Sequence, residues 1–169
     1  MTKILFLDID GTIADNSERL IIAHKAGPPK TPEWLKAMGN PDLIYKDIPY
    51  PGAPEAVQKA VVAGFAVFYI THRKVPEAAI TIKWLADNGF PRPDGITACA
   101  SFAADKPKII KTEADRADPE SILIFIDNDP HQIAKVIHLS PAVVCITLPH
   151  TASGLGSAKH DFWKHVRFW

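Results

Sequence analysis

Four short runs of nearly uninterrupted apolar residues predict buried β-strands at 3–9, 65–71, 121–127 and 142–147. A strand with one face in solvent would alternate apolar and polar residues, whereas a strand covered on both faces is apolar throughout. A weaker run at 95–101 is a fifth candidate. The pattern therefore predicts a mainly parallel, five-stranded sheet that is enclosed by other elements.

Helical patterns separate these runs, at 53–64, 75–89, 105–117 and 129–139. In the second of them, for example, Ile80 and Trp84 stand four residues apart, which places them on one face of a helix. Strands that alternate with helices are typical of an α/β domain with right-handed crossovers. We therefore expect a Rossmann-like, three-layer α/β/α fold.

Residues 14–52 interrupt this alternation and hold six of the fifteen prolines. Only two short stretches, 16–26 and 32–38, have helical character. We interpret 14–52 as a small insertion after the first strand, either a flap or cap over a site or a surface loop with no role. Trp34 either packs this insertion onto the domain or stacks on a base or sugar.

The C-terminal tail, 150–169, combines basic residues and histidines with four aromatic side chains. Such a tail either docks its aromatic residues on its own domain or binds a partner. With the insertion and the tail included, residues 1–169 are expected to form a single domain.

The first strand runs into two aspartates, Asp8 and Asp10. Residues i and i+2 of a strand point the same way, so the two carboxylates are expected on one side, at the carboxyl edge of the sheet where ligands bind. Two close carboxylates repel unless a cation lies nearby, and Mg²⁺ prefers oxygen ligands of this kind. Gly11 then permits a tight turn, and Thr12 offers a hydroxyl group.

Other polar residues follow the later strands in the same way. Thr71, His72 and Arg73 follow the second strand, Lys106 begins a helix, and Asp127, Asn128 and Asp129 close the 121–127 strand. The carboxyl ends of parallel strands meet at one edge, so these groups are expected to gather around the aspartate pair. Paired acids, a hydroxyl, a lysine and a third acid suit metal-assisted phosphoryl transfer.

At these residues the sequence resembles the haloacid dehalogenase (HAD) superfamily. Residues 8–12 resemble its first motif, DxDGT, and Thr71 resembles the second. Lys106 resembles the third, with Lys108 as a rival, and Asp127 resembles the fourth. Residues 71–73 are similar to the S/T-x-R form in the phosphatase domain of polynucleotide kinases, although Asn128 stands where a second aspartate is usual.

The resemblance implies a role for each of these residues. Asp8 would be the nucleophile and Asp10 the general acid and base, while Thr71 and Lys106 would hold the phosphoryl oxygens. Mg²⁺ would be bound by Asp8, the Asp10 carbonyl oxygen and Asp127. Asn128 is a further candidate ligand, and Asp129 either assists there or caps the next helix. Gly11, Thr12, His72 and Arg73 are the candidate substrate-binding residues.

The resemblance thus implies a Mg²⁺-dependent phosphomonoester hydrolase that forms an aspartyl-phosphate. The substrate would be a phosphorylated small molecule, or a nucleotide or nucleic-acid end such as a polynucleotide 3′-phosphate. Two alternatives stay open, a phosphomutase and a non-catalytic phosphate- or nucleotide-binding module on the same fold.

Composition bears on the partners of the protein and on its cellular compartment. The chain is 47% hydrophobic and 22% charged with zero formal net charge, so no overall positive field attracts a polyanion or a membrane surface. Cys99 and Cys145 lie in apolar stretches and are expected to be reduced, buried thiols. With no signal segment or apolar run long enough to span a membrane, we expect a cytoplasmic protein. The sequence does not indicate an oligomeric state.

Overall fold

Five parallel strands form the central sheet of the computed structural model, which describes residues 1–95, 97–148 and 157–168. The strand order is β5-β4-β1-β6-β7. Their bounds are β1 (Lys3–Leu7), β4 (Ala66–Ile70), β5 (Ala98–Ser101), β6 (Ile122–Asp127) and β7 (Val144–Thr147). The first strand is central and pairs in parallel with both β4 and β6. The chain therefore brings the ends of three strands together at the middle of one sheet edge.

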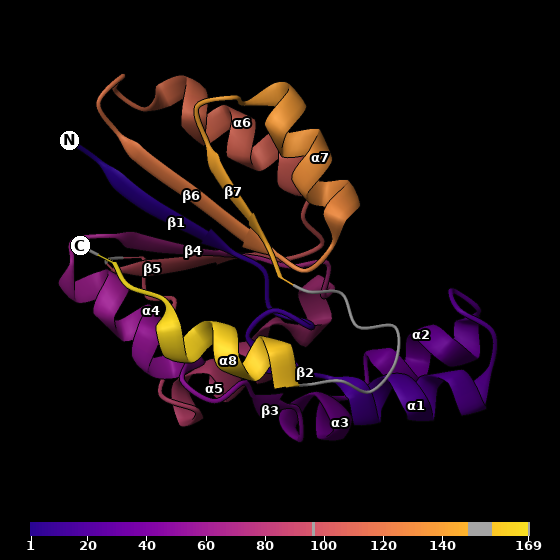
Figure 1. Ribbon diagram of the computed structural model, residues 1–169. Helices are drawn as coiled ribbons and strands as arrows, with labels where there is room; N and C mark the ends of the chain where they lie inside the picture. The colour runs from indigo at the N-terminus through magenta and orange to yellow at the C-terminus, as the bar shows by residue number, and fades with distance from the viewer. Residues whose placement is uncertain (96, 149–156, 169) are drawn as a thin grey trace.

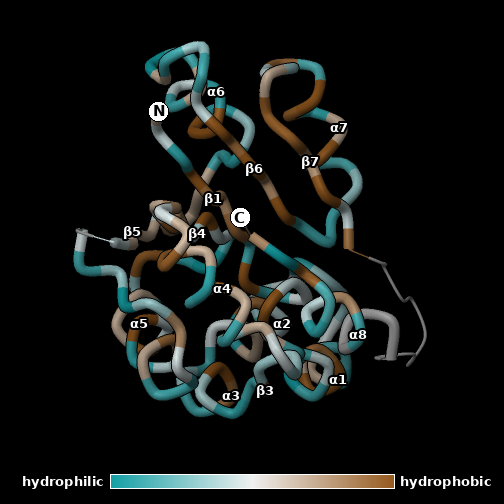
Figure 2. Tube along the Cα trace, turned by 60° about the vertical axis from the view of Figure 1, so that its left-hand side comes forward, coloured by the Kyte–Doolittle hydropathy of each residue, from teal (hydrophilic) through white to brown (hydrophobic). Residues whose placement is uncertain are grey.

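Helices cover both faces of this sheet (Figure 1). One face carries α6 (Lys106–Arg116) and α7 (Pro130–Leu139). The other carries α4 (Ala53–Val62), α5 (Ala78–Asp87) and α8 (Ser157–His165). Figure 2 shows hydrophobic residues along β1 and β6, as expected for central strands covered on both faces. The predicted three-layer α/β/α fold with a parallel five-stranded sheet is confirmed.

The insertion between β1 and α4 contains more structure than its sequence predicts. It comprises β2 (Ala14–Asp15), α1 (Ser17–Ala26), α2 (Pro32–Met38), α3 (Pro41–Tyr45) and β3 (Ile48–Pro49). The third helix and the antiparallel β2–β3 pair are not visible as patterns, because each spans only a few residues. Figure 1 shows the three helices beyond the end toward which the strands point, which is the edge where ligands are expected.

The described part of the C-terminal tail is docked on the domain. Trp163, in α8, is 1% exposed and belongs to the same core cluster as β1 and α4. Residues 150–156 and Trp169 of the predicted tail lie outside the described residues. The described residues of the tail therefore show the first of its two interpretations, docking on its own domain.

Two remaining expectations concern the thiols and the membrane. Cys99 and Cys145 are free, but both are half-buried rather than buried, and burial raises the pKa of each thiol. Among the described residues, no helix has the length and apolar character needed to cross a membrane.

Candidate active site

A buried lysine joins two carboxylates at the middle of the sheet edge. The Lys106 Nζ lies 2.7 Å from the Asp8 Oδ1 and 2.7 Å from the Asp127 Oδ2. Asp8 directly follows β1 and Asp127 ends β6, and the Asp8 N–H donates to the Ile126 carbonyl at 3.1 Å. All three charged side chains are almost completely buried. Residues far apart in sequence thus meet at one point.

The turn after Asp8 fixes the other oxygen of its carboxylate. The Thr12 hydroxyl donates to the Asp8 Oδ2 at 2.7 Å and accepts from the Asn128 N–H at 3.2 Å. Gly11 has a φ of 75°, and a Cβ atom there would clash with the Asn128 side-chain amide. Glycine is therefore required both by the turn conformation and by the close approach of Asn128. The predicted turn residues hold the Asp8 carboxylate in place.

Lys106, and not its rival Lys108, contacts Asp8. Lys106 is the first residue of α6, whose N-cap Asp105 accepts from the Lys108 N–H at 3.4 Å. The side chain of Lys106 points into the site, whereas Lys108 is exposed. Asp129 caps α7 in the same manner, by accepting from the His131 N–H at 2.8 Å.

Thr71 lies at the end of β4 beside β1, but its hydroxyl is engaged with the backbone. The Thr71 Oγ1 accepts from the Arg73 N–H at 3.1 Å, in a short turn that fixes the next two residues. His72 is exposed and close enough to Lys106 to respond to its charge. Although the residue as a whole is exposed, partial burial of its ring, and then the Lys106 charge, lower the pKa of His72.

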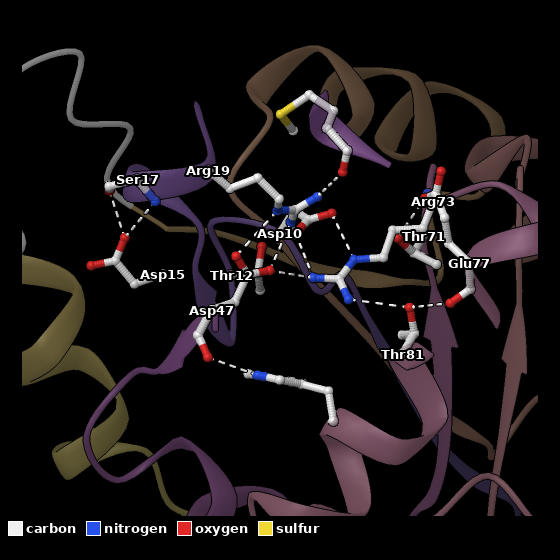
Figure 3. Close-up of polar contacts among 12 residues, drawn as sticks. Asp10, Thr12, Asp15, Ser17, Arg19, Asp47, Thr71, Arg73, Glu77 and Thr81 are labelled. Carbon is white, nitrogen blue, oxygen red and sulfur yellow. Dashed lines mark hydrogen bonds and ion pairs between the residues drawn. The ribbon is translucent and has the colours of Figure 1, made fainter. Parts of the chain in front are cut away.

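Asp10 belongs to a second cluster, in which two arginines and two aspartates interlock (Figure 3). Arg73 binds the Asp10 carboxylate in bidentate fashion, at 3.0 Å from Nε and 2.7 Å from Nη2. Arg19 from α1 also contacts Asp10, and its Nη2 lies 2.8 Å from the Asp47 Oδ2. The Asp47 Oδ2 is in turn 2.8 Å from the Arg73 Nη2. The insertion is thereby tied to the residues after β1 and β4.

The Asp10 carboxylate has different charged partners from the Asp8 carboxylate, although only one residue separates them. The strand ends at Leu7, and Asp10 lies within the turn that follows, in which the Ile9 carbonyl accepts from the N–H groups of residues 12, 13 and 14. Burial alone would raise the pKa of Asp10, but the charges of Arg73 and Arg19 outweigh it and hold the pKa far below its usual range. Asp8 contacts a lysine, and Asp10 contacts the two guanidinium groups.

Sequence reasoning missed Arg19 and Asp47. Neither lies in a recognisable motif, and both belong to the insertion. The one available signal is that Arg19 stands four residues before Ala23, on the buried face of α1. A fully buried arginine requires an acidic partner, but helical spacing does not identify which acid provides it.

The charges around Lys106 are unequal, with two carboxylates for one ammonium group. Burial, and then the charge of Asp8, raise the pKa of Asp127 to about 7. Burial disfavours the charged form of Lys106, but Asp8 and Asp127 outweigh it and raise its pKa. Without a further cation, the pair of carboxylates therefore favours a bound proton on Asp127 near neutral pH.

This predicts a pH-dependent stability for the metal-free protein. Between about pH 4 and 7 the folded state holds a proton on Asp127 that the unfolded state releases, so the free energy of unfolding decreases as pH rises through this range. We expect the melting temperature of wild type to fall between pH 5 and pH 8 by about 5 °C more than that of Asp127→Asn. Equal decreases for the two proteins, measured by circular dichroism in EDTA, would contradict the assignment.

The same imbalance suits a divalent cation with oxygen ligands. The oxygen donors that the contacts bring together are the Asp8 and Asp127 carboxylates and, beside Thr12, the Asn128 side-chain amide. Among the residues that the structure describes, no three His, Cys, Asp or Glu side chains form a metal-binding group. A cation here would therefore need backbone, amide, water or phosphate oxygens beside the two carboxylates, and Mg²⁺ readily retains waters of this kind.

Solved structures with the same architecture include a phosphatase and a HAD domain. The class C acid phosphatase from Bacillus anthracis with tungstate bound matches with a TM-score of 0.59 and 19% identity, over 99% of this chain and 81% of that chain. The HAD domain of the effector protein Lem4 from Legionella pneumophila matches with a TM-score of 0.52 and 14% identity, over 86% of this chain and 85% of that domain's chain. The chain has the HAD fold.

A third match is a chain of the Pnkp1/Rnl/Hen1 RNA repair complex, with a TM-score of 0.55 and 16% identity. It covers 87% of the present chain but only 42% of the other. No protein-family model and no curated protein sequence matches this sequence. At these low identities the likeness establishes the HAD fold, and the chemistry must be argued from the residues of this chain.

Proposed function

We propose that this chain is a Mg²⁺-dependent phosphomonoester hydrolase that acts through an aspartyl-phosphate on Asp8. The observation that carries the proposal is the buried contact of Lys106 with both Asp8 and Asp127 at the carboxyl edge of the sheet. Burying three charged groups costs desolvation free energy, and a site that binds a phosphoryl group and a cation gives these charges a function. The solved phosphatase with this fold supports the broader class of activity, a phosphoester hydrolase.

In the proposed reaction an Asp8 carboxylate oxygen attacks phosphorus, and the bond from phosphorus to the leaving-group oxygen breaks. Thr12 holds the other Asp8 oxygen, which leaves the carboxylate correctly turned for this attack. Lys106 offsets the negative charge of Asp8 and of the incoming phosphoryl oxygens. Water then attacks the phosphorus of the aspartyl-phosphate, which releases inorganic phosphate and restores Asp8.

Asp10 is the proposed proton carrier, and its two arginines affect the two steps differently. It would protonate the leaving alkoxide in the first step and take the proton of the attacking water in the second. Arg73 and Arg19 hold Asp10 as an anion, which opposes the first role. We therefore propose that an arriving phosphate draws Arg73 partly away from Asp10, so that the pKa of Asp10 rises when substrate binds.

Mg²⁺ would be held by the Asp8 and Asp127 carboxylates, the Asp10 carbonyl oxygen and the Asn128 side chain, with water and phosphate oxygens completing the shell. When bound, the ion would neutralise charge on the transferring phosphoryl group. Asn128 carries no charge, so it would contribute less to cation affinity than the aspartate that is usual at this position.

A class of substrate is suggested by a cavity of about 420 Å³ that adjoins Asp10, Arg73 and α2. Trp34, Leu35 and Met38 provide an apolar wall, and Lys30 and Lys74 add positive charge. The Trp34 Nε1 is buried and has no hydrogen-bond partner among the described residues. We propose that the substrate is a nucleotide or a polynucleotide 3′-phosphate end, and that this cavity holds the part of it that leaves as an alcohol.

The test is phosphate release from p-nitrophenyl phosphate, 3′- and 5′-nucleotides, 3′-phosphorylated oligonucleotides and sugar phosphates. We expect turnover with Mg²⁺, a decrease of at least about tenfold in excess EDTA, and recovery when Mg²⁺ is restored. Nucleotide-type substrates should exceed sugar phosphates in kcat/KM. Faster turnover of sugar phosphates would overturn the substrate class, and transfer of phosphate to a second substrate hydroxyl rather than to water would indicate a phosphomutase. Phosphate binding without release from any of them would favour the non-catalytic module.

A further inference from the structure

The C-terminal helix reaches the turn that carries the proposed nucleophile. The Trp163 Nε1 donates a hydrogen bond of 2.8 Å to the Thr12 carbonyl oxygen, across 151 positions of sequence. Trp163 is 1% exposed, and Thr12 is completely buried. A buried carbonyl needs a donor, and the indole N–H provides one that is excluded from water. A side chain from the end of the fold therefore fixes the backbone of the motif at its beginning.

Thr12 connects this contact to the chemistry. Its carbonyl faces Trp163, whereas its hydroxyl donates to the Asp8 Oδ2 and accepts from the Asn128 N–H. A rotation of the Thr12 peptide would move the hydroxyl that orients the Asp8 carboxylate. The indole thus acts on Asp8 through one intervening residue.

The helix is held against the domain by contacts on both sides of Trp163. A Cβ atom at Gly52 would lie 3.3 Å from the backbone of Trp163 and Lys164, so α8 packs closely on the turn before α4. Further along, the Phe168 and Phe65 rings pack edge to face with centroids 5.5 Å apart. Figure 1 shows α8 lying beside α4. These apolar contacts hold α8 in place, and the indole N–H makes the polar contact with the turn that follows Asp8.

We propose that Trp163 is a positioning residue for the nucleophile, which it orients through Thr12, so that the described end of the tail serves catalysis as well as folding. The inference rests on the proposed function, because it assigns Asp8 as the group to be oriented. Its structural part, that the indole N–H rigidifies the 8–14 turn, holds independently of any activity.

Trp163→Phe tests the proposal, because it retains an aromatic ring and removes only the donor and the second ring. We expect kcat to fall about 5- to 50-fold with KM within about twofold, since a misoriented nucleophile slows the chemical step while substrate contacts remain. We also expect faster amide hydrogen exchange in a peptide covering residues 8–14. Assays at 15 °C, normalised to the folded fraction by circular dichroism, keep the comparison among folded molecules.

Phe168→Leu is the matched control, because it loosens α8 through the Phe65 contact and leaves the Thr12 hydrogen bond in place. It should lower the melting temperature but leave kcat, and exchange in residues 8–14, unchanged at 15 °C. Equal losses of kcat in the two variants, or wild-type kcat and exchange in Trp163→Phe, would overturn the positioning role. If wild type releases no phosphate from any substrate, the proposed function fails, and hydrogen exchange alone decides whether Trp163 fixes the turn. Trp163→Tyr, measured in the same way, replaces Trp163→Phe if the latter does not fold.

Discussion

Asp8→Asn is expected to abolish phosphate release, with kcat lower by at least about 10⁴-fold, because an amide oxygen is a poor nucleophile and no neighbouring group replaces it. The substitution is nearly isosteric and keeps an acceptor for Thr12. It also removes one of the two carboxylates beside Lys106, so the fold should persist. Initial rates with p-nitrophenyl phosphate and saturating Mg²⁺ provide the measurement.

Two further observations separate loss of the nucleophile from loss of structure. Asp115→Asn is the matched control, since Asp115 lies on α6 with its side chain 61% exposed, and it should retain wild-type kcat. A single turnover of wild type with labelled substrate, quenched in acid, should leave phosphate on the protein in a hydroxylamine-sensitive bond, and Asp8→Asn should leave none. More than about one tenth of the wild-type rate in Asp8→Asn would contradict nucleophilic catalysis by this residue.

The Asp8→Asn variant also isolates an electrostatic effect. The charge of Asp8 is, after burial, the largest cause of the raised pKa of Asp127, so removing it should lower that pKa toward the ordinary range. The pH dependence of stability assigned to Asp127 should therefore weaken in Asp8→Asn. The two carboxylates and Lys106 act as one unit, and substitution of any member changes the others.

The sheet could be predicted from sequence because its strands are buried on both faces. Residues 3–9 and 121–127 contain continuous apolar runs, and the observed strands Lys3–Leu7 and Ile122–Asp127 lie within them. The place where β1 ends was less predictable. An apolar residue, Ile9, continues the run after the strand has ended, because it packs in the core from the turn. Periodicity therefore located the strand but not the residue at which it ends.

The candidate site was predictable to the extent that strand ends fix it. Asp8, Thr71 and Asp127 each follow or close a strand, so parallel topology alone gathers them. Arg19 and Asp47 reach the site from the insertion, whose short elements follow from contacts rather than from a repeating pattern. Their pairing depends on how α1 and α3 pack, and this is a tertiary property.

The hydrogen bond from Trp163 to Thr12 was unpredictable for a related reason. An aromatic tail signals docking, since its rings need burial, but it does not specify the surface on which it docks. Local patterns contain no information about a contact between the first and last elements of a chain. The groups that position the site are therefore harder to predict than the groups proposed to react.

Arg73→Ala is expected to destabilise the protein by about 3 kcal/mol, because it leaves the buried carboxylate of Asp47 and the half-buried carboxylate of Asp10 with Arg19 as their only guanidinium partner among the described residues. Arg73 is 4% exposed, and its Nη1 also donates to the Thr81 hydroxyl at 3.2 Å. Urea unfolding followed by circular dichroism measures the change. Arg116→Ala, which removes an exposed arginine paired with Glu113, should change stability by less than about 0.5 kcal/mol.

Arg73→Lys separates the charge from the shape of the guanidinium group. Lysine restores one positive charge but not the planar fork that binds both Asp10 oxygens, so about half of the lost stability should return. Both substitutions should also allow the pKa of Asp10 to rise, because a major lowering influence on it is removed or weakened. If ionised Asp10 is the base for water, the acidic limb of the kcat profile should move to higher pH in both variants. A wild-type pH profile and stability in Arg73→Ala would show that the arginine clamp neither holds the insertion nor controls the charge of Asp10.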